Sequence, residues 1–170
     1  MNRRAANWLL ACACIATLTA HAETADREKP MKIEADRANF DQKQMLGVYT
    51  GNVVVTQGTM VMKSAVLNVR QDEAGNQYIT GNGKPVTFRQ RLDSGEWVDA
   101  QSLSFDYDGK TGLLKLIDKA WVRRDTGDEV IGQVITYNMN TEVYEAQGGK
   151  DGGSSGRVNI TIQPKKKAEQ

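Results

Sequence analysis

The sequence predicts an all-β fold in which short antiparallel strands follow one another through hairpins. Three observations support this prediction. Apolar and polar residues alternate with a period of two from Met31 onward, which places every second side chain on one face of a strand. Turn-forming residues recur at short intervals between the alternating runs. The chain has only three prolines, and no segment shows the apolar stripe of an amphipathic helix.

The alternating runs can be taken in order along the chain. They cover residues 31–36, 49–55, 60–62, 67–69, 103–107, 114–116 and 157–162. The turns between them contain Asp, Asn or Gly, which tolerate or stabilise tight backbone bends. These turns lie at residues 41–42, 57–58, 74–76, 93–95, 108–112, 126–128 and 138–140. The first and last runs are the expected edges of the sheet, where backbone groups stay unpaired.

A spacing of about 30 residues indicates a repeating β-unit. Gly51, Gly81, Asp118 and Gly148 stand at intervals of 30, 37 and 30 residues. An aromatic residue followed by a turn-opening Asp or Asn stands 11 residues before three of them, at Phe40, Tyr107 and Tyr137. We expect each turn residue to bond its own backbone. The triplet Thr-Gly-Asn occurs at residues 50–52 and 80–82. A glycine within a strand more often marks a bend or a close backbone approach than a ligand site, so we interpret the triplets as structural.

Residues 1–22 are predicted to be a secretory signal peptide. Arg3 and Arg4 precede an apolar run, and small residues near Ala22 form the expected cleavage site. A lipoprotein signal is the alternative, because Cys12 follows small and apolar residues. We expect a soluble, exported protein with a single domain at residues 23–163 and a basic flexible tail at residues 164–170.

Loss of the signal peptide removes both cysteines and the single histidine, Cys12, Cys14 and His21. A disulfide framework, a cysteine nucleophile, a Ser-His-Asp triad and a His/Cys zinc site are then excluded, and we predict no enzymatic activity, no metal and no cofactor. Removing Arg3 and Arg4 from the 22 basic residues leaves them one short of the 21 acidic residues. This balance provides no basic surface for nucleic acid.

The inward face of the predicted strands is rich in methionine and aromatic residues. Core packing is the simplest explanation of this composition. Methionine also adapts to irregular apolar shapes, so a continuous inward face in an exported protein could hold acyl chains. The residues that define this face are Met31, Phe40, Met60, Met62, Phe88, Phe105, Tyr107 and Tyr137.

Three segments carry a resemblance to a known family. The run GNVVVTQGTMVMKSAVLNV begins at Gly51, IEADRANFD precedes it, and GNGKPVTF follows it from Gly81. With these segments the sequence resembles the LptA/OstA family of periplasmic lipopolysaccharide-transport proteins over residues 29–162. Asp118 departs from the family pattern, which usually has another glycine at that position.

The resemblance implies an open, slightly twisted β-jellyroll of consecutive antiparallel strands with an apolar interior. It implies a periplasmic protein that carries lipopolysaccharide, associates head to tail with itself, and contacts the jellyroll domains of an inner-membrane LptC and an outer-membrane LptD. Met31, Phe88 and Tyr107 match family positions in contact with lipid A. Extension by strand parity adds further inward residues, namely Ile33, Phe40, Tyr49, Val53, Met60, Met62, Phe105 and Tyr137.

An exported carbohydrate-binding or carbohydrate-cleaving β-domain is the alternative function. Such a domain would present aromatic rings outward as platforms for sugars. Trp97 and Trp121 are the tryptophans that follow the predicted signal peptide, so their position on the sheet bears on this alternative.

Overall fold

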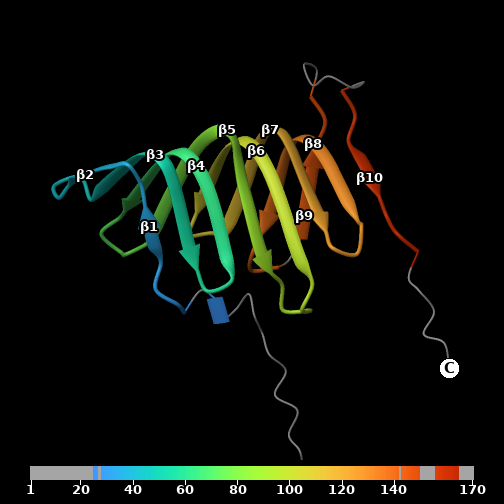
Figure 1. Ribbon diagram of the computed structural model, residues 1–170, viewed down its shortest axis with the longest axis horizontal. Helices are drawn as coiled ribbons and strands as arrows, with labels where there is room; N and C mark the ends of the chain where they lie inside the picture. The colour runs from blue at the N-terminus through green and yellow to red at the C-terminus, as the bar shows by residue number, and fades with distance from the viewer. Residues whose placement is uncertain (1–24, 27, 142, 150–155, 165–170) are drawn as a thin grey trace, which may run out of the picture.

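A computed structural model describes residues 25–26, 28–141, 143–149 and 156–164. The predicted signal peptide and most of the predicted basic tail lie outside these residues. The described chain forms one antiparallel sheet, which confirms the predicted all-β class (Figure 1). Its strands are β1 (Lys32–Glu34), β2 (Arg37–Asp41), β3 (Leu46–Gln57), β4 (Met60–Gln71), β5 (Gln77–Arg91), β6 (Trp97–Asp108), β7 (Leu113–Arg124), β8 (Glu129–Asn138), β9 (Val143–Gln147) and β10 (Asn159–Thr161).

Six long strands form the centre of the sheet, in the order β3-β4-β5-β6-β7-β8. Each pairs with the next along the chain, so hairpins connect them all. β1 and β2 both pair with β3, and β9 and β10 both pair with β8. β1 and β10 therefore lie at the two ends of the strand order, as predicted for residues 31–36 and 157–162.

The long strands bend near their middle, and the bends fold the sheet into two facing layers (Figure 1). The pairing register shifts at each bend, between Thr50/Val53, Lys63/Val66, Asn82/Val86, Gln101/Ser104 and Ile117/Ala120. In Figure 1 the strands arch over at the top and the β3–β4, β5–β6 and β7–β8 turns lie below, so the layers are joined along one side and open along the other. The predicted runs at 60–62, 67–69, 103–107 and 114–116 are parts of longer strands, whereas the run at 49–55 crosses the bend of β3. A bend interrupts the alternation without ending the strand.

We refer to the two halves of the folded sheet as layer A and layer B. Layer A contains β2, β9 and residues 46–50, 66–71, 77–82, 104–108, 113–117 and 134–138 of the long strands. Layer B contains β1, β10 and residues 53–57, 60–63, 86–91, 97–101, 120–124 and 129–132.

Gly51 and Asp118, two of the four repeated positions, lie at bends, whereas Gly148 lies after β9. At the bend of β3, Gly51 has a φ of 80° and Asn52 a φ of 45°. Asp36 holds this bend, since its N–H donates to the Gly51 carbonyl at 2.9 Å and its carboxylate accepts from the Asn52 amide at 2.9 Å. At the bend of β7, Asp118 and Lys119 have φ values of 64° and 51°. At these two positions of the repeat the backbone is left-handed, even where aspartate replaces glycine.

Gly81 serves a different purpose, because it allows close packing. A Cβ atom at Gly81 would lie 2.3 Å from Cε1 of Phe105 and 3.0 Å from the carbonyl oxygen of Val66. We expect Gly81→Ala to lower the free energy of unfolding by about 1–3 kcal/mol, because an overpacked core forces side chains out of their rotamers. Urea denaturation would measure the loss. The cost should shrink in a Phe105→Leu background, and an equal cost in both backgrounds would contradict the clash.

The hairpin turns of layer A confirm the predicted bonding of turn residues to their own backbone. Oδ1 of Asp41, Asp108 and Asn138 each accepts the backbone N–H groups two and three residues later, at 2.9–3.2 Å. In the remaining turn of this layer, Asp72 accepts the backbone N–H of Asn76 at 2.8 Å and its side-chain amide at 2.9 Å. That side-chain hydrogen bond is the main cause that lowers the pKa of Asp72.

The inward side chains of both layers pack into one core. Every long strand from β3 to β8 contributes to the main buried cluster. Leu67 and Ala120 are fully enclosed, and Val53, Val55 and Ile135 are only 1% exposed. The inward face predicted from alternation is therefore the face that the fold buries.

Candidate functional site: an apolar groove between the layers

The open side of the folded sheet leads into an apolar groove. A cavity of about 240 Å³ occupies the part of the groove nearest β1. Its apolar lining comes from both layers: Met31, Met60, Met62, Ile79, Phe88, Phe105, Tyr107, Leu114 and Met139. Its polar lining, Asp26, Gln57, Gln77 and Gln90, lies outside the strands or near their ends. The groove thus has an apolar interior and a polar rim.

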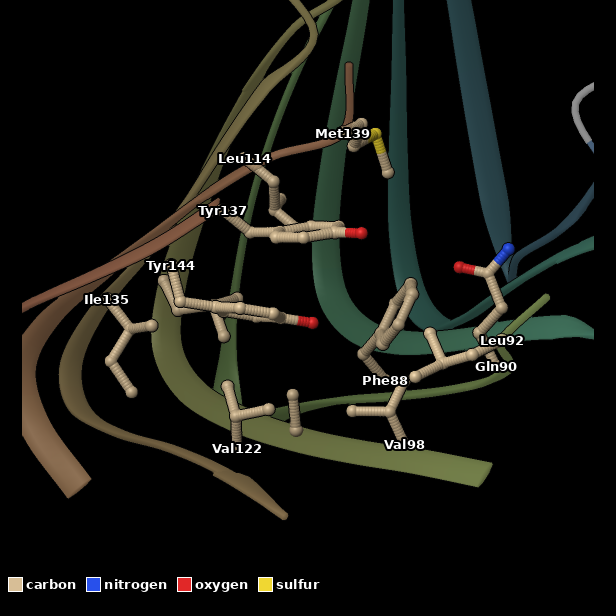
Figure 2. A pocket seen from close by; sticks show the side chains of 12 residues that line it. Phe88, Gln90, Leu92, Val98, Leu114, Val122, Ile135, Tyr137, Met139 and Tyr144 are labelled. Carbon is tan, nitrogen blue, oxygen red and sulfur yellow. The ribbon is translucent and has the colours of Figure 1, made fainter. Parts of the chain in front are cut away.

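A second cavity continues the groove toward β9. It shares four lining residues with the first cavity, Phe88, Gln90, Leu114 and Met139. Figure 2 shows the rings of Tyr137 and Tyr144 lying one above the other on one wall, with both hydroxyl oxygens pointing toward the side that carries Phe88. Their ring centroids are 4.3 Å apart and their planes differ by 20°. The open volume here is only about 30 Å³, so the stacked tyrosines line a narrow part of the groove.

A third cavity, of about 90 Å³, lies at the end of the groove nearest β2. Phe40, Tyr49 and Val69 contribute to its walls, and Gln77 is common to this cavity and the first. Shared lining residues connect the three cavities, so they form a row along the interior from β2 to β9.

The structure brings the predicted binding residues to the inner side of the sheet, at different depths. Those that line the first two cavities are Met31, Met60, Met62, Phe88, Phe105, Tyr107 and Tyr137. Tyr49 lines the third cavity, Ile33 packs against the core, and Val53 belongs to the packed core. Phe40 is 59% exposed, because β2 pairs only with β3 among the described strands and nothing covers its far side.

The repeat predicts a strand between the turn at 138–140 and Gly148, where β9 lies, but sequence reasoning did not name its inward residue Tyr144. β9 has five residues and pairs with β8, which places Tyr144 opposite Tyr137. Tyr144 and Ala146 do alternate with polar Glu145 and Gln147, but a run this short is a weak signal. The turn predicted at residues 138–140 is the feature that could have identified the pairing, since a hairpin must return along the strand that precedes it.

Both ends of the groove expose apolar side chains. At the β10 end, Ile160 is 61% exposed and Ile162 is 79% exposed, while Phe40 is exposed at the β2 end. Ile160 lies opposite Val130, which packs against the core, so it continues the inner face of layer B. The apolar interior is therefore open at both ends as well as along one side.

Trp97 and Trp121 lie on the outer face of layer B. The Arg89 guanidinium lies 4.8 Å from the ring centroid of Trp97, and that of Arg123 lies 5.2 Å from Trp121. Arg123 also pairs with Glu129 at 2.5 Å. Outward aromatic rings, which the carbohydrate alternative requires, are thus present, but an arginine already stacks on each ring.

The groove is suited to apolar contact rather than to acid–base or metal chemistry. Aliphatic, aromatic and methionine side chains make up most of its first two cavities. Within the described residues, no group of three or more His, Cys, Asp or Glu side chains is placed to hold a metal ion. The same part of the chain contains no helix that is long and apolar enough to cross a membrane.

Comparison with known proteins relates this architecture to one family. The family described as "LptA/(LptD N-terminal domain) LPS transport protein" matches residues 32–143. The lipopolysaccharide export system protein LptH of Pseudomonas aeruginosa is 33% identical over 164 residues, which cover 92% of this chain and 92% of that protein. The lipopolysaccharide export system protein LptA of Escherichia coli is 30% identical over 148 residues, or 85% of this chain and 80% of that protein. The crystal structure of LptH from P. aeruginosa, described as the periplasmic component of a lipopolysaccharide transport device, superposes with a TM-score of 0.72 at 32% identity, covering 82% of this chain and 99% of that one.

Proposed function

Because this chain belongs to the LptA/(LptD N-terminal domain) family of lipopolysaccharide transport proteins, we propose that its groove shields the acyl chains of lipid A during transport across the periplasm. The family is one of non-enzymatic transport proteins, and the chain is an LptA-type transport component. The observation that carries the proposal is the row of apolar cavities between two layers that stay open along one side.

The hydrophobic effect explains why such a groove is needed. Exposing an acyl chain to water costs about 0.8 kcal/mol per methylene, so a chain of a dozen methylenes costs about 10 kcal/mol. The inner walls would cover the chains, while sugars and phosphates remain outside along the open side. Both layers offer apolar walls along the row of cavities, so an acyl chain could slide from one cavity to the next, with the narrow part at Tyr137 and Tyr144 as the tightest point.

The proposed lipid-binding residues are those that face this interior. Met31, Phe88 and Tyr107 line the first cavity and are the central contacts. We extend the binding surface to Ile33, Phe40, Tyr49, Val53, Met60, Met62, Phe105 and Tyr137, and we add Tyr144 because it stacks on Tyr137. Val53 would act as packed floor beneath the ligand, since it is 1% exposed.

The ends of the sheet are the proposed sites of assembly. β1 and β10 lie at the ends of the strand order, so each can accept a strand from another jellyroll by β-augmentation. Such a contact joins unlike ends and does not close, so it can build a filament. We infer head-to-tail self-association and contacts with an LptC-type inner-membrane jellyroll and an LptD-type outer-membrane translocon. These contacts would cover Phe40 and Ile160, which are exposed in the single chain.

Export to the periplasm is part of the same proposal. Residues 1–22 would be removed as a signal peptide, which leaves the jellyroll domain at residues 23–163 and a basic tail at residues 164–170. The relatives identified as LptA and LptH, together with the periplasmic LptH structure, support this location.

In vivo photocrosslinking tests the groove directly. A photoreactive amino acid at Phe88 or Tyr107 should capture lipopolysaccharide, because both side chains line the first cavity. The same amino acid at Lys63 should capture none, because Lys63 is exposed and adjoins Met62 on the opposite face of β4. Immunoblotting for the adduct would measure capture, and equal labelling at all three positions would contradict an internal groove. Binding of delipidated polysaccharide as tight as that of intact lipopolysaccharide would favour the carbohydrate alternative.

A further inference from the structure

A buried carboxylate ties the chain before β1 to the edge of the groove. Asp26 is 5% exposed. Its Oδ1 accepts the backbone N–H of Thr59 at 2.8 Å, and its Oδ2 accepts the Thr59 hydroxyl and the Gln90 side-chain amide, the latter at 3.3 Å. Burial of a carboxylate is tolerated only when hydrogen bonds replace its water, and these three bonds do so. The docked position of Asp26 is therefore specific.

The β3–β4 turn is shaped to receive this residue. Gly58 has a φ of 58°, and a Cβ atom on it would lie 1.8 Å from Oδ1 of Asp26. Any other residue at that position would displace the carboxylate. A second attachment lies close by, where the Gln57 side-chain amide donates to the carbonyl oxygen of Lys29 at 2.9 Å. The segment is thus held at two points along the same turn.

The docked segment lies at the open side of the groove. Asp26 and Met31 line the first cavity, whose lining also includes Gln77 of the opposite layer and Met139 of the turn beyond it. In Figure 1 the short blue element at residues 25–26 sits at the foot of the β3–β4 hairpin, below the arch formed by the strands. It therefore narrows the side opening of the groove near β1.

We propose that the described residues before β1, 25–26 and 28–31, form a strap over the side opening, with Asp26 as its latch. The strap restricts sideways loading of acyl chains. The inference rests on the proposed function of the groove and concerns how the ligand reaches it. A chain that enters sideways near β1 must displace a carboxylate that holds three hydrogen bonds, and must pass a negative charge that also repels phosphate. A chain that enters lengthwise displaces no such carboxylate, since among the described residues no acidic side chain lines the cavity at the β2 end. While the strap is docked, loading thus proceeds from the ends.

Uptake kinetics of an NBD-labelled dodecanoic acid test the strap in the processed protein. Asp26→Ala removes the latch and should raise the rate of probe uptake about 10-fold. Asp26→Asn keeps the shape but weakens the hydrogen bonds, so it should give an intermediate rate. Glu28→Ala is the matched control, because Glu28 is an exposed acid in the same segment, and its uptake rate should equal that of the wild type.

A disulfide between the strap and the β3–β4 turn would lock the strap in place, whereas Asp26→Ala releases it. The pair Asp26→Cys and Thr59→Cys joins positions whose side chains are in contact, and processing removes Cys12 and Cys14. The oxidised protein should take up the probe at least 10-fold more slowly than the reduced one, while Thr59→Cys alone should show no redox effect. Equal rates in the oxidised and reduced proteins, or an unchanged rate in Asp26→Ala, would overturn the strap alone. A failure of every variant and the wild type to bind the probe would overturn the groove function and the strap with it.

Discussion

Replacing Phe88 by aspartate is expected to weaken lipopolysaccharide binding about 50-fold and to stop transport in cells, while the protein remains folded. Phe88 is half-buried and lines both the first and the second cavity, so an acyl chain in the groove must pass it. A carboxylate at this position stays hydrated, because burying it without a partner is costly, so an acyl chain cannot pack against it. If contact with about three methylenes is lost, at about 0.8 kcal/mol each, the binding free energy falls by an amount that corresponds to the 50-fold loss of affinity. Titration with fluorescent lipopolysaccharide would measure it.

The neighbouring residue provides the control for this experiment. Thr87 lies on the outer face of β5, opposite Lys63 and Gln101, so Thr87→Asp adds the same charge outside the groove. We expect that variant to bind lipopolysaccharide within about twofold of the wild type, since its charge lies on the outer face of the sheet, away from the groove. Circular dichroism would verify that both proteins are folded. Normal transport by a folded Phe88→Asp protein would show that acyl chains do not pass through the groove.

Truncating Leu67 to alanine is expected to lower the free energy of unfolding by about 2–5 kcal/mol. Leu67 is 0% exposed and belongs to the main core cluster. Truncation of the side chain loses buried apolar surface, and it leaves a cavity that the packed layers cannot close. A loss of this size is a large part of the 5–15 kcal/mol that typically stabilises a domain. Urea denaturation monitored by tryptophan fluorescence would measure it.

The same substitution on the outer face gives the comparison. Leu113 precedes the inward Leu114 on β7 and therefore points away from the groove. We expect Leu113→Ala to cost less than about 1 kcal/mol, because a half-buried outer side chain leaves no enclosed cavity. Equal losses in the two variants would mean that strand parity does not define the core.

The turns and bends of this protein are predictable from sequence where their cause is local. Asp41, Asp108 and Asn138 each bond backbone groups within three residues, so the turn chemistry is contained in the turn itself. Gly51 likewise meets a local requirement, since its φ of 80° is one that glycine adopts without strain. The family resemblance adds to this, because it identifies the jellyroll that the comparisons support.

Depth of burial is less predictable than the face on which a residue lies. Parity places Phe40 and Val53 on the inner side, and the structure agrees. Phe40 is nevertheless 59% exposed and Val53 is 1% exposed. The difference arises because Val53 lies between layers that close over it, while Phe40 lies on a strand with a partner on one side only. Alternation along one strand carries no information about what covers that strand.

The groove also depends on contacts between distant parts of the chain. Asp26 reaches its hydrogen-bond partner Gln90 across 64 residues of sequence, and no local motif marks it as a latch. Tyr144 becomes a wall of the groove only because β9 returns along β8 and stacks it on Tyr137. Both are polar or amphipathic residues in short segments, where periodicity gives little signal.

Sequence is enough to predict the all-β class, the order of the hairpins, most residues of the inward face and the membership of the family. These features follow from alternation, turn chemistry and motif, which act over a few neighbouring residues. The folded structure was needed to show that the long strands bend into two layers, that the space between them narrows at the stacked tyrosines, and that a buried aspartate holds the chain over the side opening. These outcomes depend on bend positions and packing between strands that are far apart in sequence, and a local pattern cannot specify them.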